Sequence, residues 1–272
     1  MDPAVSFILT HYKDQEFLKP CIESIKRHVR NFDYEIFVAD SETQESTRRL
    51  IRNEFPDVIL CGSKENVGFS KIVNAALKRT RGSYIAILNS DILLPDSSIE
   101  NIFRYFEAHK NVGLAGPALF YPDGTPQSSA FRFYSPFTIL TRRTFMGKTF
   151  LGKHDLDRFL MKDRVLTREP ITVDWLMGSA LFTTKKALND VGPLDERFFM
   201  YFEDVDWSRR FWEKGYKVVY YPATRLIHHH VKTSKTPRGL LDLLSNPYAR
   251  IHLASAVKYF LKHGPSTPRY GV

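Results

Sequence analysis

Short apolar runs alternate with amphipathic stretches through the first 116 residues of the chain. The amphipathic stretches repeat their apolar residues at steps of three and four, as at Leu18, Cys21, Ile22 and Ile25, which is typical of helices. The apolar runs are typical of buried strands, and they predict strands at residues 5–9, 34–39, 58–61, 84–88 and 112–115. Strands that alternate with helices indicate right-handed crossovers, and therefore an α/β fold with a mainly parallel central sheet flanked by helices.

The rest of the chain is patterned less regularly. Residues 171–182 are typical of a strand, a glycine break and a second strand, and residues 217–221 of a strand that leads to His228. Residues 135–168 are basic and aromatic without a clear period, and we interpret them as a mobile segment over the site. Helices are expected at residues 185–191 and 203–214.

A last helix is expected after Pro247, as a C-terminal helical appendage. Its pattern is amphipathic and basic. The predicted faces carry Leu253, Val257, Phe260 and Leu261 on one side and Arg250, Lys258 and Lys262 on the other. Packing of this helix against the domain and contact with an anionic membrane surface both agree with the pattern.

The net charge of +9 and the isoelectric point near 9.4 indicate an anionic partner: a nucleic acid, an acidic membrane surface or a phosphorylated substrate. The basic excess is concentrated at residues 131–170 and after residue 227. No apolar run reaches the roughly 20 residues that span a bilayer, and the N-terminus lacks a signal-peptide layout, so a cytoplasmic location is expected. Cys21 and Cys61 lack metal-binding spacing and are expected to be buried free thiols.

Polar residues gather where the predicted strands end. They are Thr10, His11 and Tyr12 after the first strand, Asp40 after the second, Asn66, Gly68, Phe69 and Lys71 after the third, and Asn89, Ser90 and Asp91 after the fourth. Taken singly, an Asp or Asn in this position is most often a helix cap. Because parallel strands end at one sheet edge, where α/β folds bind ligands, we expect these residues to converge. We interpret Asp91 as a ligand of a divalent metal that holds a diphosphate, and Asp40 as an acceptor for a ribose or base.

Three carboxylates, Glu203, Asp204 and Asp206, follow an aromatic run at a predicted helix N-terminus. The structural explanation is the favourable interaction of acids with the first turn of a helix. The functional interpretation is a general base in a site whose aromatic walls restrict water. At an ordinary pKa of about 4, an aspartate is ionised at neutral pH and accepts a proton without special tuning.

Three consecutive histidines, His228, His229 and His230, follow the last predicted strand. Alternate residues of a strand point to one face, so His228 and His230 are able to act together. One histidine, one aspartate and two phosphate oxygens would complete most of an octahedral shell for Mg²⁺ or Mn²⁺, and the imidazole favours Mn²⁺.

Seven blocks stand in order along the chain: Ile8-Leu-Thr-His-Tyr12, Val38-Ala-Asp-Ser41, Asn66-Val-Gly-Phe69 with Asn74, Leu88-Asn-Ser-Asp91, Trp175-Leu-Met-Gly178, Phe202-Glu-Asp-Val-Asp206, and Pro222 to His228. In order and spacing they resemble the family 2 glycosyltransferases of GT-A fold, a Rossmann-like nucleotide-diphosphosugar transferase fold, and most of all the bacterial rhamnosyltransferase-like branch. The resemblance runs from about residue 4 to 232. Two positions depart from the family pattern. His11 stands before Tyr12 where Tyr then Asn is usual, and Asn89 replaces the first acid of the DXD motif.

The resemblance implies inverting transfer of a sugar, such as rhamnose or another hexose, from a nucleotide diphosphosugar to a hydroxyl acceptor. It implies that Asp204, with Glu203, is catalytic, and that Asp91 and His228 bind Mn²⁺ or Mg²⁺, with His230 as the alternate. The strand-end residues from Thr10 to Asp91 would bind the nucleotide-sugar. The acceptor site would consist of Trp175, Met177, Gly178, Ser179, Asp206 and Trp207.

The resemblance also implies a domain division and partners. Residues 1–232 would form the GT-A domain, with a nucleotide-sugar-binding half at 1–116 and an acceptor-binding half at 117–232, followed by a helical extension at 233–272. The donor would be a dTDP-, UDP- or GDP-sugar, and the acceptor a glycan or a polyprenyl-diphosphate-linked molecule of cell-surface polysaccharide synthesis. We expect peripheral contact with the inner face of the cytoplasmic membrane, whereas a homodimer stays open.

Other classes of protein are weighed against this one. A non-catalytic nucleotide-sugar or polyanion-binding module of the same fold would be expected to have lost Asp91 or the Glu203–Asp204 pair. A nucleic-acid binder would explain the charge, but no recognised binding motif occurs, so no nucleic-acid partner is expected. A nucleotidyltransferase normally has a glycine-rich loop after its first strand, and residues 10–14 contain no glycine. The chain also lacks GxGxxG and GxxxxGK[ST], which argues against a dinucleotide dehydrogenase and a P-loop enzyme.

Overall fold

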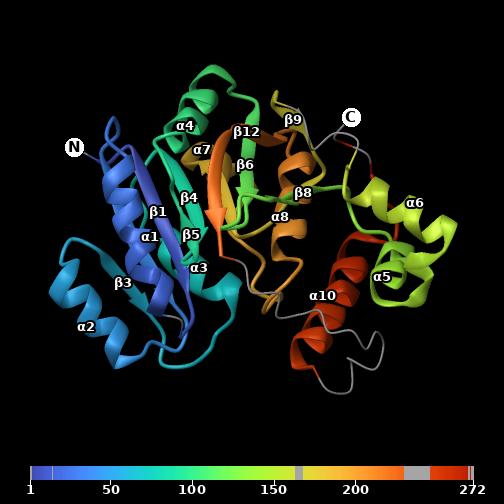
Figure 1. Cartoon of the computed structure of the whole chain (residues 1–272), viewed down its shortest axis with the longest axis horizontal. Helices are drawn as coiled ribbons and strands as arrows, with labels where there is room; N and C mark the ends of the chain where they lie inside the picture. Colours follow the sequence, from blue (N-terminus) through green and yellow to red (C-terminus); the bar gives the residue numbers. More distant parts are fainter. Residues whose placement is uncertain (1, 14, 163–167, 230–245, 269, 271–272) are drawn as a thin grey trace.

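A mixed β-sheet stands at the centre of the molecule, with helices on both faces (Figure 1). The computed structural model describes residues 2–13, 15–162, 168–229, 246–268 and 270. Within these residues the sheet has ten strands. Its main path runs β3 (Ile59–Gly62), β2 (Tyr34–Asp40), β1 (Val5–His11), β4 (Tyr84–Asn89), β11 (Ala180–Thr184), β6 (Val112–Phe120), β12 (Lys217–His228) and β5 (Ile92–Leu93). The expected α/β sheet is confirmed.

The sheet is parallel at one side and mixed at the other. Strands β3, β2, β1 and β4 are parallel, and β6 is parallel to β12. β11 runs antiparallel between β4 and β6. The remaining short strands are β7 (Pro126–Gln127) on β6, β9 (Ile171–Thr172) on β12, and the separate antiparallel pair of β8 (Ala130–Phe131) with β10 (Trp175–Leu176).

Alternate side chains of the central strands enter two cores on opposite faces of the sheet. Phe7 and Leu9 of β1 lie in one core, whereas Ile8 lies in the other. The first core is covered by α1 (Gln15–His28), α2 (Glu45–Glu54) and α4 (Ile99–Ala108), and the second by α3 (Phe69–Leu77), α7 (Lys185–Val191) and α8 (Glu203–Glu213). The apolar runs of the sequence therefore form strands because both of their faces are buried.

Residues 136–159 form helices where the sequence predicted a mobile segment without regular structure. They are α5 (Pro136–Arg143), the 3₁₀ helix η1 (Phe145–Lys148) and α6 (Phe150–Phe159). Ser135 caps α5 by accepting a hydrogen bond from the Thr138 amide, and Thr149 caps α6 by accepting one from the Gly152 amide. These helices lack an obvious sequence period because their apolar side chains point both inward and to solvent, as the buried Phe159 and the exposed Phe137 do.

An aromatic core joins these helices to the domain. We call it the third core, and it contains Phe131, Phe133, Tyr134, Phe159, Trp175, Phe198, Phe202, Val205, Ala256 and Tyr259. Its members come from β8, β10, α6, the residues before and within α8, and the C-terminal helix α10 (Pro247–His263). Figure 1 shows α5, α6 and α10 beside one another, outside the central sheet.

α10 is the expected C-terminal helix, but its predicted apolar face is wrong. Three of the four residues on that face are exposed: Leu253, Val257 and Leu261. The buried side carries Ala249, Ser255, Ala256 and Tyr259 instead. Three of these four side chains are small, which lets the helix approach the domain closely. The Ser255 hydroxyl donates to the Met200 carbonyl at 2.9 Å.

A smaller expectation is confirmed, because Cys21 and Cys61 are buried free thiols. A turn after residue 121 joins β6 to β7 in an antiparallel hairpin. In the part of the chain that the structure describes, no helix combines the length and the hydropathy needed to cross a membrane.

Candidate active site

Hydrogen bonds join the carboxyl ends of β1 and β4, where the predicted polar residues follow the strands. Thr10 Oγ1 donates to Asn89 Oδ1 at 2.9 Å, and the Ser90 amide donates to the Thr10 carbonyl at 3.0 Å. The Asn89 amide donates to the Ser179 carbonyl at 2.9 Å. Residues from three distant parts of the sequence thus meet directly before Asp91.

Asp91 and His228 face each other beyond this strand end. Asp91 Oδ1 lies 3.4 Å from His228 Nε2, with the His228 side chain buried and the Asp91 side chain 24% exposed. The His229 amide donates to the Asp91 carbonyl at 3.0 Å. β12, which ends at His228, pairs with β5, which follows Asp91, so the sheet itself sets this approach. His230, the alternate ligand, lies outside the described residues.

Gln127 holds the other ring nitrogen of His228, and nothing in the sequence pattern had singled it out. Its Oε1 lies 2.5 Å from His228 Nδ1, and its side chain is buried. An amide oxygen only accepts hydrogen bonds, so Nδ1 carries a proton, and Nε2 is the ring nitrogen that faces Asp91. Gln127 belongs to β7, in a polar stretch with no motif, and only the hairpin brings it to β12.

The Asp91 and His228 side chains fit part of a metal site. Asp91 Oδ1 is buried and accepts no hydrogen bond within the described structure. A carboxylate oxygen and an imidazole nitrogen together suit Mn²⁺ or Mg²⁺. Among the described residues, no group of three or more His, Cys, Asp and Glu side chains could hold a metal. A metal here would therefore need further oxygen ligands from a substrate, as Mg²⁺ commonly takes from phosphates.

His11 and Asp40 form a second buried pair at the same sheet edge. His11 Nδ1 lies 2.8 Å from Asp40 Oδ1, while the buried Asp40 Oδ2 has no hydrogen-bond partner within the described structure. A buried acceptor without a partner costs free energy that a ligand donor would recover, so this oxygen suits the predicted ribose or base contact. Tyr12 and Lys71 are exposed, and the Tyr12 hydroxyl donates to Glu42 Oε2 at 3.2 Å.

The loop before α3 is fixed by its own polar groups and by the acceptor half of the chain. Asn66 Oδ1 accepts hydrogen bonds from the Ser41 hydroxyl at 3.2 Å and the Gly68 amide at 3.1 Å. Gly68 has a φ of +81°, and a Cβ atom there would lie 2.4 Å from the Phe199 carbonyl oxygen, so only glycine fits. The Phe69 amide donates to the same carbonyl oxygen at 2.8 Å.

Two aromatic residues set the start of α8 in a strained turn. Tyr201 and Phe202 have φ values of 68° and 69°, a left-handed conformation that costs a bulky residue of order 1–3 kcal/mol. Phe202 is buried in the third core, where its ring lies 4.8 Å from that of Tyr134 and 5.5 Å from that of Tyr259, measured between centroids. This packing compensates for the strain and fixes the direction of the two acids that follow.

Asp204 is held by two backbone amides. Its Oδ2 accepts a hydrogen bond from the Gly178 amide and its Oδ1 one from the Val205 amide, both at 2.9 Å. Burial raises the pKa of Asp204 to about 6, although these amides act in the opposite direction. A carboxylate with this pKa is largely ionised at neutral pH and is a better proton acceptor than an ordinary aspartate, which suits a general base.

Glu203 is buried next to Asp204, and its Oε2 has no hydrogen-bond partner within the described structure. Burial, followed by the negative charge of Asp204, raises the pKa of Glu203 well above its ordinary value. Two adjacent buried carboxyl groups resist ionising together. The raised pKa favours the protonated form of Glu203, so Asp204 is the member of the pair that ionises more readily.

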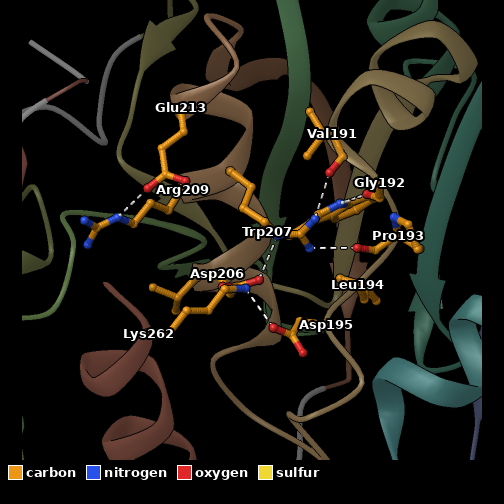
Figure 2. Close-up of polar contacts among 12 residues, drawn as sticks. Val191, Gly192, Pro193, Leu194, Asp195, Asp206, Trp207, Arg209, Glu213 and Lys262 are labelled. Atoms are coloured by element: carbon orange, nitrogen blue, oxygen red, sulfur yellow. Dashed lines mark hydrogen bonds and ion pairs between the residues drawn. The ribbon is translucent and has the colours of Figure 1, made fainter. Parts of the chain in front are cut away.

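Asp206 points into the contact between α8 and α10 (Figure 2). Its Oδ1 lies 2.6 Å from Lys262 Nζ and 2.7 Å from His263 Nε2, and its Oδ2 accepts from Arg210 Nε at 2.9 Å. Burial favours a higher pKa for Asp206, but the hydrogen bond from His263 and the charges of Arg210 and Lys262 hold that pKa below its ordinary value. Its side chain is fully buried.

Trp207 is likewise enclosed, and its Nε1 donates to the Gly192 carbonyl at 2.9 Å. Asp206 and Trp207 are thus engaged in contacts inside the fold, and their part in an acceptor site stays a prediction.

The segment 175–179 connects the acid pair to the strand end at Asn89. The Trp175 ring stacks on Phe131 with centroids 4.4 Å apart, and the Met177 amide donates to the Ser129 carbonyl at 2.9 Å. The Gly178 amide holds Asp204, while the Ser179 carbonyl holds Asn89. The residues predicted for acid–base chemistry, for the acceptor and for the metal therefore meet along one hydrogen-bonded path.

Comparison with known families decides the class of this protein. The family model of glycosyl transferase family 2 matches residues 6–160, and that of glycosyl transferase family group 2 matches residues 84–245. The chain belongs to glycosyl transferase family 2. The first match covers the carboxyl ends of β1, β2 and β4 and Asp91, and the second spans the segments that carry Asp204 and His228.

Two rhamnosyltransferases are among the relatives of this family 2 protein. It is 27% identical over 218 residues to the N-acetylglucosaminyl-diphospho-decaprenol L-rhamnosyltransferase of Mycobacterium tuberculosis, which covers 76% of this chain and 70% of the relative. It is 21% identical over 265 residues to the rhamnosyltransferase WbbL of Escherichia coli K12, which covers 95% of this chain and 93% of the relative. The predicted resemblance to rhamnosyltransferase-like members of family 2 is confirmed.

Solved structures of similar shape confirm the GT-A fold of this family 2 chain. GalNAc-T7 with UDP, GalNAc and Mn²⁺ superposes with a TM-score of 0.67 at 13% identity, covering 92% of this chain and 47% of that one. The chain thus spans about half the length of that structure. The mannosyltransferase PcManGT from Pyrobaculum calidifontis, with GDP-Man and Mn²⁺, has a TM-score of 0.62 at 16% identity and covers 99% of this chain and 66% of that one.

Proposed function

We propose that the protein is an inverting, metal-dependent glycosyltransferase that moves a hexose, with rhamnose as one candidate, from a nucleotide diphosphosugar to a hydroxyl group. The observation that carries the proposal is the hydrogen-bonded path to Asp204 from Asn89, which stands two residues before Asp91. Asn89 bonds to Ser179, and the adjacent Gly178 bonds to Asp204. Groups suited to a leaving diphosphate and to a reacting hydroxyl are thereby fixed relative to each other, as a single displacement requires.

The donor nucleotide binds along the carboxyl edge of β1, β2 and β4. Asp40 Oδ2 accepts from its ribose or base, and Thr10 and the Asn66 loop line the same edge. The buried, unsatisfied Asp40 Oδ2 supports this placement. The donor is a dTDP-, UDP- or GDP-sugar, and the UDP and GDP-Man bound in the structures of similar fold support this class of ligand.

Asp91 Oδ1 and His228 Nε2 hold the divalent metal, Mn²⁺ or Mg²⁺. When bound, the metal supplies positive charge against the negative charge that develops on the leaving diphosphate. Gln127 keeps the His228 proton on Nδ1, so that Nε2 remains a lone-pair donor. The Mn²⁺ in both solved relatives supports this role.

Asp204 accepts the proton of the acceptor hydroxyl as that oxygen attacks the anomeric carbon. The bond between the anomeric carbon and the diphosphate oxygen breaks with its electron pair, and the new glycosidic bond forms on the opposite face. One displacement inverts the anomeric centre. Glu203 stays protonated and therefore adds no negative charge beside the base.

The acceptor is a hydroxyl group of a glycan or of a polyprenyl-diphosphate-linked sugar in cell-surface polysaccharide synthesis, reached at the inner face of the cytoplasmic membrane. Trp175, Met177, Gly178 and Ser179 line its site. The name of the Mycobacterium tuberculosis relative, which specifies a diphospho-decaprenol acceptor, supports a lipid-linked substrate. The net charge of +9 supports an anionic one.

Calorimetric titration with UDP, dTDP and GDP, each with and without Mn²⁺, tests the proposal. We expect one nucleotide to bind only with the metal, and Asp91→Ala to weaken this binding by at least about tenfold. Asp96→Ala is the matched control, because Asp96 is an exposed aspartate five residues further along the chain. Absence of metal-dependent binding to all three nucleotides would overturn the proposal and favour a non-catalytic polyanion-binding module.

A further inference from the structure

Exposed apolar side chains are concentrated on one part of the molecule. Among the described residues, nine large apolar side chains are exposed, and eight of them lie on α5, η1, α6 and α10. The ninth is Tyr12, at the donor edge. We call α5, η1, α6 and α10 the helical lobe. The inner faces of these helices are buried in the third core. The exposed apolar residues are therefore additional to the residues that pack the lobe against the domain.

The most exposed of these residues lie together in the sequence, where η1 passes into α6. Phe145 is 79% exposed, Phe150 87% and Leu151 69%. We call these three residues the apolar tip. An isolated exposed leucine or phenylalanine needs no explanation, but three almost fully solvated ones within seven residues expose an unusual amount of apolar area and mark an interaction surface.

Basic residues surround the apolar tip. Lys148 stands within it, and Lys153 follows one turn into α6, both exposed. Residues 136–159 carry five Lys and Arg against two Asp, and α10 carries three Lys and Arg and no acid. Of the two acids, Asp155 is buried against Thr141 and Arg158, and Asp157 pairs with Lys162 and also interacts with Lys153, so Lys148 and the net basic excess remain.

We infer that the apolar tip docks this protein on an anionic membrane surface, with Phe145, Phe150 and Leu151 entering the boundary of the acyl chains and Lys148 and Lys153 contacting lipid phosphates. Apolar side chains beside lysines are the composition that binds anionic bilayers, because burial of apolar area and attraction to negative headgroups act together. A protein partner would not by itself explain why Lys and Arg outnumber Asp by five to two in residues 136–159.

The inference deepens the proposed function, since a lipid-linked acceptor lies in a membrane, and its test uses vesicles that contain no acceptor. The third core joins the helical lobe to Phe202 at the start of α8 and to Trp175 of the acceptor segment. A membrane bound at the tip is thereby adjacent to the acceptor half rather than to the donor strands β2 and β3.

Co-flotation of the full chain with vesicles at low salt tests the inference. We expect retention on vesicles of phosphatidylcholine and phosphatidylglycerol in equal parts and little on phosphatidylcholine alone. The double variant Phe145→Ser/Phe150→Ser should lower partitioning by about tenfold, since two aromatic side chains no longer enter the boundary. The double variant Lys148→Glu/Lys153→Glu should lower it by about a hundredfold.

Lys78→Glu/Lys110→Glu is the matched control, because it makes the same change in net charge at two exposed lysines outside the helical lobe. It should leave partitioning within about threefold of the parent, since charges further than about 10 Å from the bilayer are screened. Nucleotide binding in every variant, measured by the calorimetry above, shows that the donor site remains folded and separates a failure of this inference from a failure of the proposed function.

Three results would overturn the inference. One is no retention of the parent on the anionic vesicles, and another is an equal loss in the tip and control lysine variants. The third is a parent dimer, measured by light scattering, that dissociates in Phe145→Ser/Phe150→Ser, because the tip would then be an interface between two copies of the chain.

Discussion

The sheet edge around Asp91 and the contact between α8 and α10 hold their carboxylates in opposite ways. Asp91 Oδ1 is a buried oxygen that accepts no hydrogen bond within the described structure and faces one imidazole nitrogen. Asp206 is surrounded by Lys262, His263 and Arg210. A carboxylate satisfied within the fold holds elements together, whereas one with an unsatisfied buried oxygen is prepared for a group from outside.

The same contrast separates the acids of α8 from one another. Glu203, Asp204 and Asp206 lie within four residues, yet the pKa of Asp206 is lowered and those of its two neighbours are raised. Their roles therefore follow from their partners rather than from their place in the motif. Substituting one carboxylate, or one residue that supports it, tests each role separately.

The largest effect is expected for Asp204→Asn. The amide cannot take the proton of the acceptor, and we expect turnover to fall by about a thousandfold. Metal-dependent nucleotide binding should change by less than about threefold, because Asp204 lies on the acceptor side. Single-turnover transfer and calorimetry on the same preparation measure the two quantities. Unchanged turnover would remove Asp204 from the role of base.

Asp206→Asn should destabilise the fold by about 3 kcal/mol, because it leaves buried cationic partners without their counter-charge. Urea unfolding measures this loss. Nucleotide binding below the unfolding transition should be unchanged. A variant that is as stable as the parent but binds acceptor poorly would return Asp206 to the acceptor site.

Gln127→Leu should weaken Mn²⁺ binding by about ten- to a hundredfold, since His228 loses the acceptor that fixes its proton on Nδ1. Gln127→Glu retains an oxygen acceptor and should restore binding. Electron paramagnetic resonance of free Mn²⁺ in the presence of nucleotide measures both without any turnover. Equal binding in the parent and the leucine variant would show that Gln127 does not orient His228.

The smallest effect is a pH dependence. With the pKa of Asp204 at about 6, the transfer rate should fall tenfold per unit as the pH drops below that value, because the base becomes protonated.

The contribution of Asp204 to the stability of the fold should change with pH in the opposite direction to the transfer rate. The folded state binds the extra proton between the ordinary pKa of 3.8 and about 6, so the contribution of Asp204 to stability decreases as the pH rises through that window. Asp206 has a lowered pKa, so its contribution is present above its ordinary value and is lost as the pH falls. A rate profile that is flat down to pH 5 would contradict the assignment.

The first half of the chain was readable from the sequence because strands and helices alternate there in a regular pattern. β1, β2 and β4 are buried on both faces, so each is a continuous apolar run, and the parallel topology alone brings Thr10 and Asn89 together. Asp91 and His228 also met as expected, because one follows a buried strand and the other ends one.

The second half of the chain was harder to read because its contacts depend on a hairpin and on α10 rather than on a regular alternation of strands and helices. Gln127 has no motif, and its meeting with His228 depends on a hairpin and a strand 101 residues away in the sequence. The roles of Asp206 and Trp207 could not be separated from that of Asp204 without α10, whose Lys262 and His263 lie more than 50 residues further along. The helices α5 and α6 were not predicted, because their apolar residues lie both on the buried side and on the exposed side and so show no helical period.

The hydrogen bond from the Phe69 amide to the Phe199 carbonyl has a kinetic consequence. It joins the loop at the donor edge to the aromatic turn that precedes the acids of α8, at a point where Gly68 leaves no room for any other residue. If the donor binds this loop as proposed, ordering the loop would also order the turn that precedes Asp204. Initial-rate measurements with both substrates varied should therefore give a compulsory order, with the donor first to arrive and the nucleoside diphosphate last to leave.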